Sequence, residues 1–524
     1  MPDGHSPSDW KPTHSPWLVA VSVLLATFME VLDTSIANVA LPHIAGSLSA
    51  SVDEATWVLT SYLVSNAVIL SSTGWLSSYF GRKRYLAFSV GLFILSSALC
   101  GMAQSLPQLI IARILQGIGG GGLQPLSQAI LLESFPPQKR GEAMAAYGMG
   151  IVVAPILGPI LGGWITDNYT WRWIFYINIP IGLAGLILQE LFVEDPPYIK
   201  EHKAETIDWQ GFGMMALGIG LLQVVLDKGQ EADWFGADWI GWSVAVAVVS
   251  LVSWVIWELT HDEPIVNLRL LKDRNFATAT VMVAFLGAVL YGTTAMLPIF
   301  MQTMMGYPAF QAGYAMMPRG LGSFFSMLIV GRLIRFVDPR LLAVLGFGGV
   351  GGSCWVLSQM NLDVAQSNIT TALFLNGFSM GFIFVPLTVL SYATLKQRQI
   401  FQATGLYNLL RNIGASVGIS AIVAVQDRVA QEHQVDIAAH LTPFSPALHR
   451  AFSGLSHMLQ GAVGAHASRL TLPIIYGELL QQSSLLSFMD SFRLLAIISL
   501  SCLPLLAFFT RPPRSGRQPT APAH

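Results

Sequence analysis

Long apolar segments, separated by short polar breaks, follow one another through most of this chain. Fourteen segments can be delimited, and each is close to the roughly 20 apolar residues that a helix needs to cross a bilayer. Their approximate limits are 17–40, 55–76, 85–104, 108–131, 143–165, 173–193, 207–227, 238–258, 276–303, 310–331, 341–360, 367–394, 400–425 and 486–510. The pattern predicts an all-α polytopic membrane protein with fourteen transmembrane helices.

A faint internal repeat divides these segments into two groups of six. The run GWLSSYFGRKR (Gly74 to Arg84) follows the second segment, and GRLIRFVDPR (Gly331 to Arg340) follows the tenth. Both runs begin with Gly and end in a basic cluster, and repeated halves are common in secondary transporters. We therefore expect an N-terminal tail at 1–16, an N-terminal half at 17–193, a linker with two inserted helices at 194–275, a C-terminal half at 276–510 and a C-terminal tail at 511–524.

Basic residues predict the orientation of these helices. With the N-terminus inside, the cytoplasmic loops and tails hold nineteen of the 28 Lys and Arg residues, the outer side holds five and the segments hold four. Such an excess of basic residues is typical of the cytoplasmic side of a membrane protein. The first 16 residues also lack the basic start and short apolar core of a signal peptide, so the first segment is expected to be retained. Both termini are predicted to be cytoplasmic.

Residues 426–485 interrupt the pattern of short loops between the last two segments. They are polar, contain amphipathic runs such as ALHRAFSGLSHML, and are predicted to lie on the periplasmic side. Two interpretations stay open for this long loop: a loosely folded surface loop, and a docking surface for a periplasmic partner.

Composition supports the membrane assignment and excludes other classes of protein. The chain is 53% hydrophobic and 11% charged, with a mean hydropathy of +0.56, whereas soluble domains carry about 25% charged residues. The net charge of −2 argues against a nucleic-acid-binding protein, which would show a basic surface. Cys100, Cys354 and Cys502 lie in apolar segments without metal-type spacing, and we expect neither a metal nor a cofactor.

Two acidic residues, Glu30 and Asp33, lie inside the first apolar segment and share one helix face. A carboxylate in hydrocarbon costs at least about 2.5 kcal/mol on insertion scales, so such acids usually face a water-filled path or an ion-coupling site. An apolar site favours the neutral carboxyl group and a nearby cation favours the charged form. A helix that moves Asp33 between two such environments would bind a proton on one side and release it on the other. Glu30 either shares this role or forms hydrogen bonds as a neutral acid.

Arg113, in the fourth segment, is the expected partner of Asp33. It shares a helix face with Gln116 and Gln124. Because an arginine in mid-membrane is rarely exposed to lipid, this face is expected to line the substrate cavity. The alternative is a static structural pair between Asp33 and Arg113.

Polar residues also occur within apolar segments of the C-terminal half. Asn376 lies in the twelfth segment, and Asn408, Arg411 and Asn412 lie in the thirteenth. All four are predicted to line the cavity. Arg319, in the tenth segment, either lines the cavity as well or extends toward the membrane interface.

Several motifs together give a specific resemblance. LDTSIANVALPHIAGSL contains Asp33, Asn38 and Pro42, and LIIARILQGIG contains Arg113. APILGPILGG lies in the fifth segment, WRWIFYINIPIG begins the sixth, and GWLSSYFGRKR occupies the loop after the second. With these motifs the chain resembles the major facilitator superfamily, and in particular its fourteen-span drug:proton antiporters of the EmrB/QacA type.

The resemblance implies a major facilitator fold and the export of hydrophobic or amphipathic compounds in exchange for protons, by alternating access between the two halves. Asn38 would belong to the cavity. The residues implied in conformational gating are Gly74, Gly81, Arg82 and Lys83 of the loop motif, and Gly150, Pro155, Gly158, Pro159 and Gly162 of the fifth segment. The EmrB likeness further implies a location in a bacterial inner membrane, a periplasmic membrane-fusion adaptor and an outer-membrane channel.

One departure from the family pattern concerns the loop motif. It normally carries an Asp where this chain has Ser78 and an Arg where it has Tyr79. Since that acid belongs to a charge-paired cytoplasmic gate, the gate of this chain is expected to close in a different way.

Two other functions are alternatives to drug export. One is uptake, or export of one dedicated metabolite such as a siderophore, and the likeness of APILGPILGG to the antiporter motif of the family argues against uptake. The other is a membrane-embedded enzyme, for which no His-Glu zinc pattern or Gly-x-Ser-x-Gly elbow occurs in the segments. A channel is less consistent still, because no ring of charge is evident.

Overall fold

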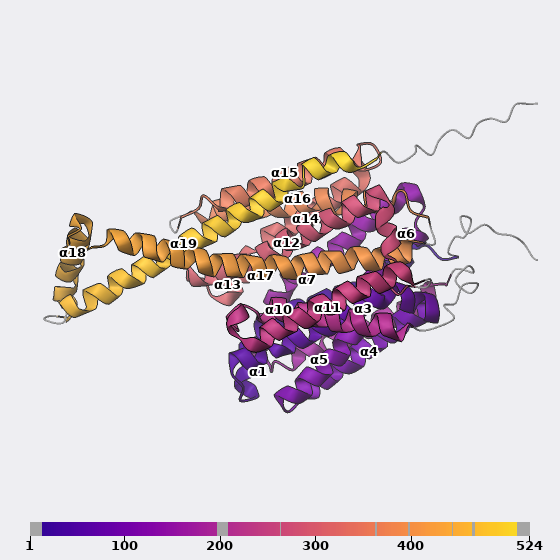
Figure 1. Cartoon of the computed structure of the whole chain (residues 1–524), viewed down its shortest axis with the longest axis horizontal. Coiled ribbons are helices and arrows are strands. Elements are labelled where there is room, and N and C mark those ends of the chain that lie inside the picture. The colour runs from indigo at the N-terminus through magenta and orange to yellow at the C-terminus, as the bar shows by residue number, and fades with distance from the viewer. Residues whose placement is uncertain are drawn as a thin grey trace, which may run out of the picture.

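The computed structural model describes residues 13–195, 208–261, 264–361, 364–396, 399–442, 444–463 and 467–510, and every regular element in these ranges is a helix. The helices form one elongated bundle, with α18 projecting at one end (Figure 1). We call the opposite end, where α1 begins and α19 ends, the tail end of the bundle.

The helices of the N-terminal half cover residues 16–192. They are α1 (Pro16–Ser47), α2 (Val52–Ala55), α3 (Trp57–Phe80), α4 (Arg82–Met102), α5 (Leu106–Gly120), α6 (Leu123–Ser134), α7 (Arg140–Asn168), α8 (Trp173–Tyr176) and α9 (Asn178–Phe192). Two of the predicted segments are each divided between two helices, α5 with α6 and α8 with α9.

The helices of the C-terminal half begin at Arg274. They are α12 (Arg274–Thr303), α13 (Ala309–Ala315), α14 (Met317–Leu333), α15 (Pro339–Leu357), α16 (Gln366–Tyr392), α17 (Ile400–His440), α18 (Pro446–Val463) and α19 (Ala467–Ser501). Between the halves lie α10 (Trp209–Lys228) and α11 (Asp238–Thr260), the two helices expected as an insertion.

Eleven helices in the described ranges are long and apolar enough to cross a membrane. The other three predicted segments are occupied by α3, by α5 with α6, and by α13 with α14, so the count of fourteen spans stays a prediction. The outer surface agrees with a lipid environment: on α11, Trp242 is 74% exposed and Val249 is 66% exposed. Large apolar surfaces of this kind are rare in water-soluble proteins.

The inserted helix α10 packs across the line where the two halves meet. On one side it contacts α3, where the Thr60 hydroxyl donates to Asp227. On the other side it contacts α17, where the Ser416 hydroxyl donates to Gln223 at 2.9 Å. The insertion therefore stabilises the pairing of α3 with α17 from outside.

The region 426–485, expected as a polar loop, is largely helical in its described residues. Helix α17 continues to His440, α18 follows, and α19 begins at Ala467. With 41 residues, α17 is about 60 Å long, twice the hydrocarbon thickness of a bilayer of about 30 Å. The two long helices contact each other where His433 of α17 lies 2.8 Å from Asp490 of α19. The search for long apolar segments did not predict these helices, because their composition is polar.

Close contacts between the two halves occur at the tail end. A Cβ added to Gly74 of α3 would lie 3.1 Å from the Cα of Gln402 in α17, and one added to Gly141 of α7 would lie 2.4 Å from Ile334, just after α14. Small residues at such crossings let the helix backbones approach closely. The structure therefore shows the tail end closed.

We predict that Gly74→Val opens this end. The added side chain overlaps Gln402, and overpacking of this kind costs about 1–3 kcal/mol, which shifts the balance between closed and open forms roughly 5- to 150-fold. Spin labels at Phe80 and Lys396, read by pulsed electron resonance, should show a longer distance in the variant. Gly91→Val is the matched control, because nothing lies within 4 Å of a Cβ at Gly91. Equal distances in both variants would contradict the prediction.

Candidate functional site

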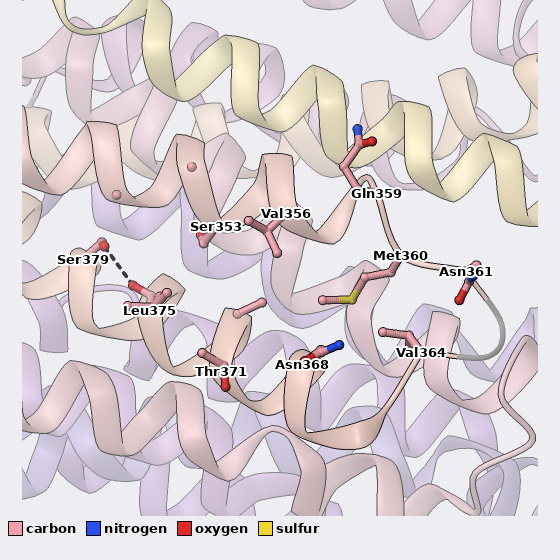
Figure 2. Close-up of a pocket in the computed structure, with 13 residues that line it drawn as sticks. Ser353, Val356, Gln359, Met360, Asn361, Val364, Asn368, Thr371, Leu375 and Ser379 are labelled. Carbon is pink, nitrogen blue, oxygen red and sulfur yellow. Dashed lines mark hydrogen bonds between the residues drawn. The ribbon is translucent and has the colours of Figure 1, made fainter.

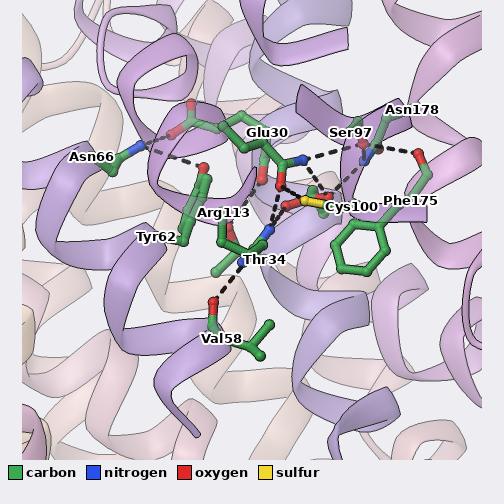
Figure 3. Close-up of polar contacts among 12 residues, drawn as sticks. Glu30, Thr34, Val58, Tyr62, Asn66, Ser97, Cys100, Arg113, Phe175 and Asn178 are labelled. Atoms are coloured by element: carbon green, nitrogen blue, oxygen red, sulfur yellow. Dashed lines mark hydrogen bonds and ion pairs between the residues drawn. The ribbon is translucent and has the colours of Figure 1, made fainter. Parts of the chain in front are cut away.

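The core of the site is a buried ion pair between Asp33 of α1 and Arg113 of α5. Nη1 of Arg113 lies 2.6 Å from Oδ2 of Asp33, and the two side chains are 0% and 1% exposed (Figure 3). The guanidinium also lies over the Tyr62 ring, 4.3 Å from its centroid, and such contacts stabilise a desolvated cation. The expected partnership of Asp33 with Arg113 is thus present in the structure.

Neutral polar groups complete the surroundings of Asp33. Its Oδ1 accepts hydrogen bonds from Asn178 of α9 at 2.6 Å and from Gln116 of α5 at 3.0 Å. The Arg113 Nε donates to the carbonyl of Val58 at 3.0 Å. The side-chain amides of Gln116 and Asn178 both donate to the Ser97 hydroxyl of α4 (Figure 3). Five helices therefore hold one carboxylate and one guanidinium in place.

Local sequence explains why these groups meet. A Cβ at Gly117 would lie 2.0 Å from the Ser65 hydroxyl, so only Gly lets α5 approach α3 closely enough to bury Arg113. Pro180 lies in the first turn of α9, where its missing N–H is not needed. This start places Asn178 at the end of the helix that faces Asp33.

Glu30 forms a second cluster one helix turn away. It is 3% exposed, and its Oε1 accepts from Asn66 of α3 at 3.0 Å and from Gln124 of α6 at 3.2 Å. Its Oε2 has no hydrogen-bond partner among the residues that the structure describes. Unlike Asp33, Glu30 accepts hydrogen bonds only from side-chain amides, and it forms no ion pair with any residue that the structure describes.

The same face of α6 connects the two halves. The Arg411 guanidinium of α17 donates to the Gln124 side-chain oxygen, and Asn408 donates to Gln128 at 2.7 Å. Gln124 thus contacts Glu30 on one side and Arg411 on the other. The predicted residues Gln116, Gln124, Asn408 and Arg411 lie in one continuous polar layer with Asp33.

Three predicted cavity residues lie outside this layer. Asn38 is exposed on α1, and its amide donates to the carbonyl of Thr34. Asn376 is buried between α16 and α15, where it donates to Ser353 at 2.9 Å. Asn412 is half-buried. Arg319 is buried, 6% exposed, rather than extended to an interface.

A hollow between α15 and α16 is lined by none of the residues that were predicted to form the substrate cavity. It is lined by Ser353, Met360, Asn368, Thr371 and other neutral side chains (Figure 2). Among the described residues that line it, none is ionisable. It therefore lacks the groups that proton or ion chemistry requires.

The small-residue stripe of α7 packs against both halves. A Cβ at Gly158 would lie 2.1 Å from Ser35 of α1, and the Cβ of Pro159 lies 3.3 Å from the position that a Cβ on Gly313 of α13 would occupy. Pro159 offers no N–H to the carbonyl of Pro155, and the Ser35 hydroxyl donates to that carbonyl at 3.1 Å. Gly162 faces Ile36 in the same way, whereas Gly150 leaves ordinary room beside Leu24.

The loop motif makes its contacts without the usual acid. Gly81 has φ +85°, which favours glycine, and Ser78 merely donates to the carbonyl of Gly74. The Arg82 guanidinium pairs with Glu133 at the end of α6 and lies 3.6 Å from the centroid of the Phe401 ring, across the interface between the halves. Glu133 thus supplies the negative charge for this basic loop.

Two further ion pairs lie at the tail end. Lys83 contacts Glu190 of α9 at 3.2 Å, within the N-terminal half. Arg335, from the repeated basic run, pairs with Glu142 of α7, and this pair joins the two halves.

Sequence reasoning missed several members of the site. Asn178 stands within WRWIFYINIPIG, and its polar side chain beside a proline in an apolar run was a usable signal. Ser97 and Asn66 carried no such signal, because single small polar residues are common in membrane helices. Glu133 lies at the polar end of a segment, where a charge is ordinary.

The helices of membrane length and the match to a transporter family place this chain among multi-pass membrane transporters. The chain belongs to the Major Facilitator Superfamily, whose family model matches residues 23–419, so the protein is a transporter and not an enzyme. The predicted resemblance is confirmed.

Individual relatives give the same placement. The chain is 37% identical to the fatty acid resistance protein FarB of Neisseria gonorrhoeae over 499 residues, which cover 94% of this chain and 96% of FarB. It is 39% identical to the multidrug export protein EmrB of Haemophilus influenzae over 431 residues, 82% of this chain and 84% of that protein. These relatives support placement in an inner membrane.

A solved structure agrees in fold. The proton:xylose symporter XylE matches with a TM-score of 0.59 at 14% identity, over 94% of this chain and 99% of that chain. At this identity the match supports the major facilitator fold and nothing finer.

We predict that Arg113→Gln destabilises the protein by about 3–5 kcal/mol, because removing one partner leaves a buried, uncompensated charge. The double variant Asp33→Asn with Arg113→Gln should recover much of this loss, since neither charge remains. Chemical unfolding in mixed micelles, read by tryptophan fluorescence, measures both. Strictly additive losses would show that the two charges do not stabilise one another.

Proposed function

We propose that this protein exports hydrophobic or amphipathic toxic compounds in exchange for protons, with Asp33 as the proton-binding residue. The observation that carries the proposal is the buried Asp33–Arg113 pair at the centre of the N-terminal half. The names of the relatives, multidrug export and fatty acid resistance, support export of such compounds. These two relatives align with 94% and 82% of this chain.

The geometry suggests how coupling would work. In the structure the tail end is closed and Asp33 pairs with Arg113. Protonation of Asp33 would cancel the attraction and release Arg113, Gln116 and Asn178 to other partners. Rearrangement of five helices around one proton would then favour the alternate packing of the two halves.

The gating residues fit the same proposal. Contacts of α7 with α14 and of α3 with α17 would separate when the tail end opens. The pair of Arg335 with Glu142, and the contact of Arg82 with Phe401, would break in that step. We propose that the tail end is the cytoplasmic end, as the basic residues of its loops predict.

We further propose that the projection formed by α17, α18 and α19 contacts a periplasmic adaptor of the membrane-fusion type, which would lead to an outer-membrane channel. The projection extends beyond the bundle (Figure 1). Among its apolar side chains, Phe444 is 91% and Met458 is 79% exposed, and a contiguous apolar surface there would mark a protein contact. Of the two interpretations kept for this region, the docking surface is the one that its helices favour.

The test is substrate-dependent proton release from inverted vesicles with an acidic interior. A transported hydrophobic drug should collapse the gradient with wild type, and Asp33→Asn should lower this response by about tenfold or more, because an amide cannot exchange a proton at neutral pH. The gradient is followed with a pH-sensitive dye. Asp436→Asn, at an exposed position of the projection, is the matched control and should behave as wild type.

Two results would overturn parts of the proposal. Full proton release by Asp33→Asn would exclude Asp33 as the coupling residue, and Glu30→Gln would then be tested in the same assay. Absence of a response in wild type across several hydrophobic drugs would favour a dedicated metabolite transporter instead.

A further inference from the structure

Arg411 is a buried cation whose surroundings do not neutralise it. The residue is 2% exposed, and within the described ranges it forms no ion pair with a carboxylate. Its guanidinium donates to the neutral side-chain oxygen of Gln124, while its Nε has no hydrogen-bond partner in those ranges. A buried charge without a partner is costly, so such a residue usually serves a ligand.

The Arg411 side chain lines a small hollow between the two halves. The walls come from α7, α12, α14 and α16, and they include Ile151, Leu290, Met327 and Phe384. Among the described residues that line the hollow, Arg411 alone is charged. The hollow therefore combines one fixed cation with flexible apolar walls, and methionine in such walls adapts to ligands of different shape.

A second guanidinium adds to the positive charge beside the hollow. Arg319 of α14 donates to the hydroxyls of Thr293 and Thr294 and to the carbonyl of Leu290, whose side chain lines the hollow. All three acceptors are neutral. The central acids, in contrast, lie in the N-terminal half at positions 30 and 33.

We propose that Arg411 binds the acidic head group of an amphipathic organic anion, whose apolar part enters between the halves as the hollow widens, because the hollow of about 20 Å³ in this structure holds no more than a water molecule. Arginine binds a carboxylate through two parallel hydrogen bonds, and here Nε is unoccupied while Nη2 donates to an amide oxygen. The incoming carboxylate would take the place of Gln124. This inference rests on the proposed export function for its biological sense, but its binding step is measured separately.

The experiment compares ligands that share one tail and differ in head group. The full-length protein in nanodiscs of zwitterionic lipid is titrated at pH 8 with decanoate, decanamide and decyltrimethylammonium, with protein-free nanodiscs as the baseline. Wild type should bind decanoate about tenfold or more tightly than decanamide, as charge-assisted hydrogen bonds allow. Equal affinities, or tightest binding of the cationic probe, would overturn the proposal without any variant.

Variants assign the preference to Arg411. Arg411→Gln should weaken decanoate binding about 10- to 100-fold and change decanamide binding less than about twofold, and Arg411→Lys should keep part of the preference. Arg493→Gln is the matched control, a guanidinium of the same half that pairs with Asp490 and does not line the hollow, and should keep the ratio of the two affinities. Equal loss of both ligands in Arg411→Gln, or loss of the ratio in Arg493→Gln, would refute the assignment.

The outcomes also separate this inference from the proposed function. A carboxylate preference without proton-coupled transport in vesicles would leave the head-group site in place and overturn the antiporter. Proton-coupled drug transport without any carboxylate preference would keep the antiporter and overturn the role of Arg411.

Discussion

The pairing of Asp33 with Arg113 is the constraint on which the centre of this structure depends. Neither charge is accessible to solvent, so each needs the other, and α1, α3, α4, α5 and α9 are arranged to supply the remaining hydrogen bonds. The close approach of α5 to α3 at Gly117 follows from this requirement.

Charge is distributed unevenly between the two halves. The N-terminal half contains two central acids and one central arginine, and the C-terminal half contributes Arg411 and Arg319. Gln124 and Gln128 lie between them and join the halves through amide hydrogen bonds, which break at a lower cost than buried ion pairs. A molecule whose halves must separate and rejoin benefits from an interface built on such exchangeable contacts.

Periodicity and charge predicted the helical fold, the two halves and the partnership of Asp33 with Arg113. Each of these follows from the free-energy cost of placing polar or charged groups in the hydrocarbon of a membrane. The division of the fourth segment into α5 and α6, and the helical nature of residues 426–440, were not predictable in this way. The first depends on contacts with α3, and the second on contacts between α17 and α19 outside the membrane. Asn376 shows the same limit: its sequence signal equals that of Asn408, but it faces α15 instead of the other half.

The continuity of α17 and α19 gives the projection the character of a lever. Both helices belong to the C-terminal half, and α17 is about 30 Å longer than the hydrocarbon thickness of a bilayer, since about 20 of its residues exceed the length needed to span it. A rotation of that half by about 10° would move the tip by about 5 Å, on the basis of that arm length. A partner that holds α18 would therefore sense which way the transporter faces, and resistance at the tip would oppose the turning of the half to which it is attached.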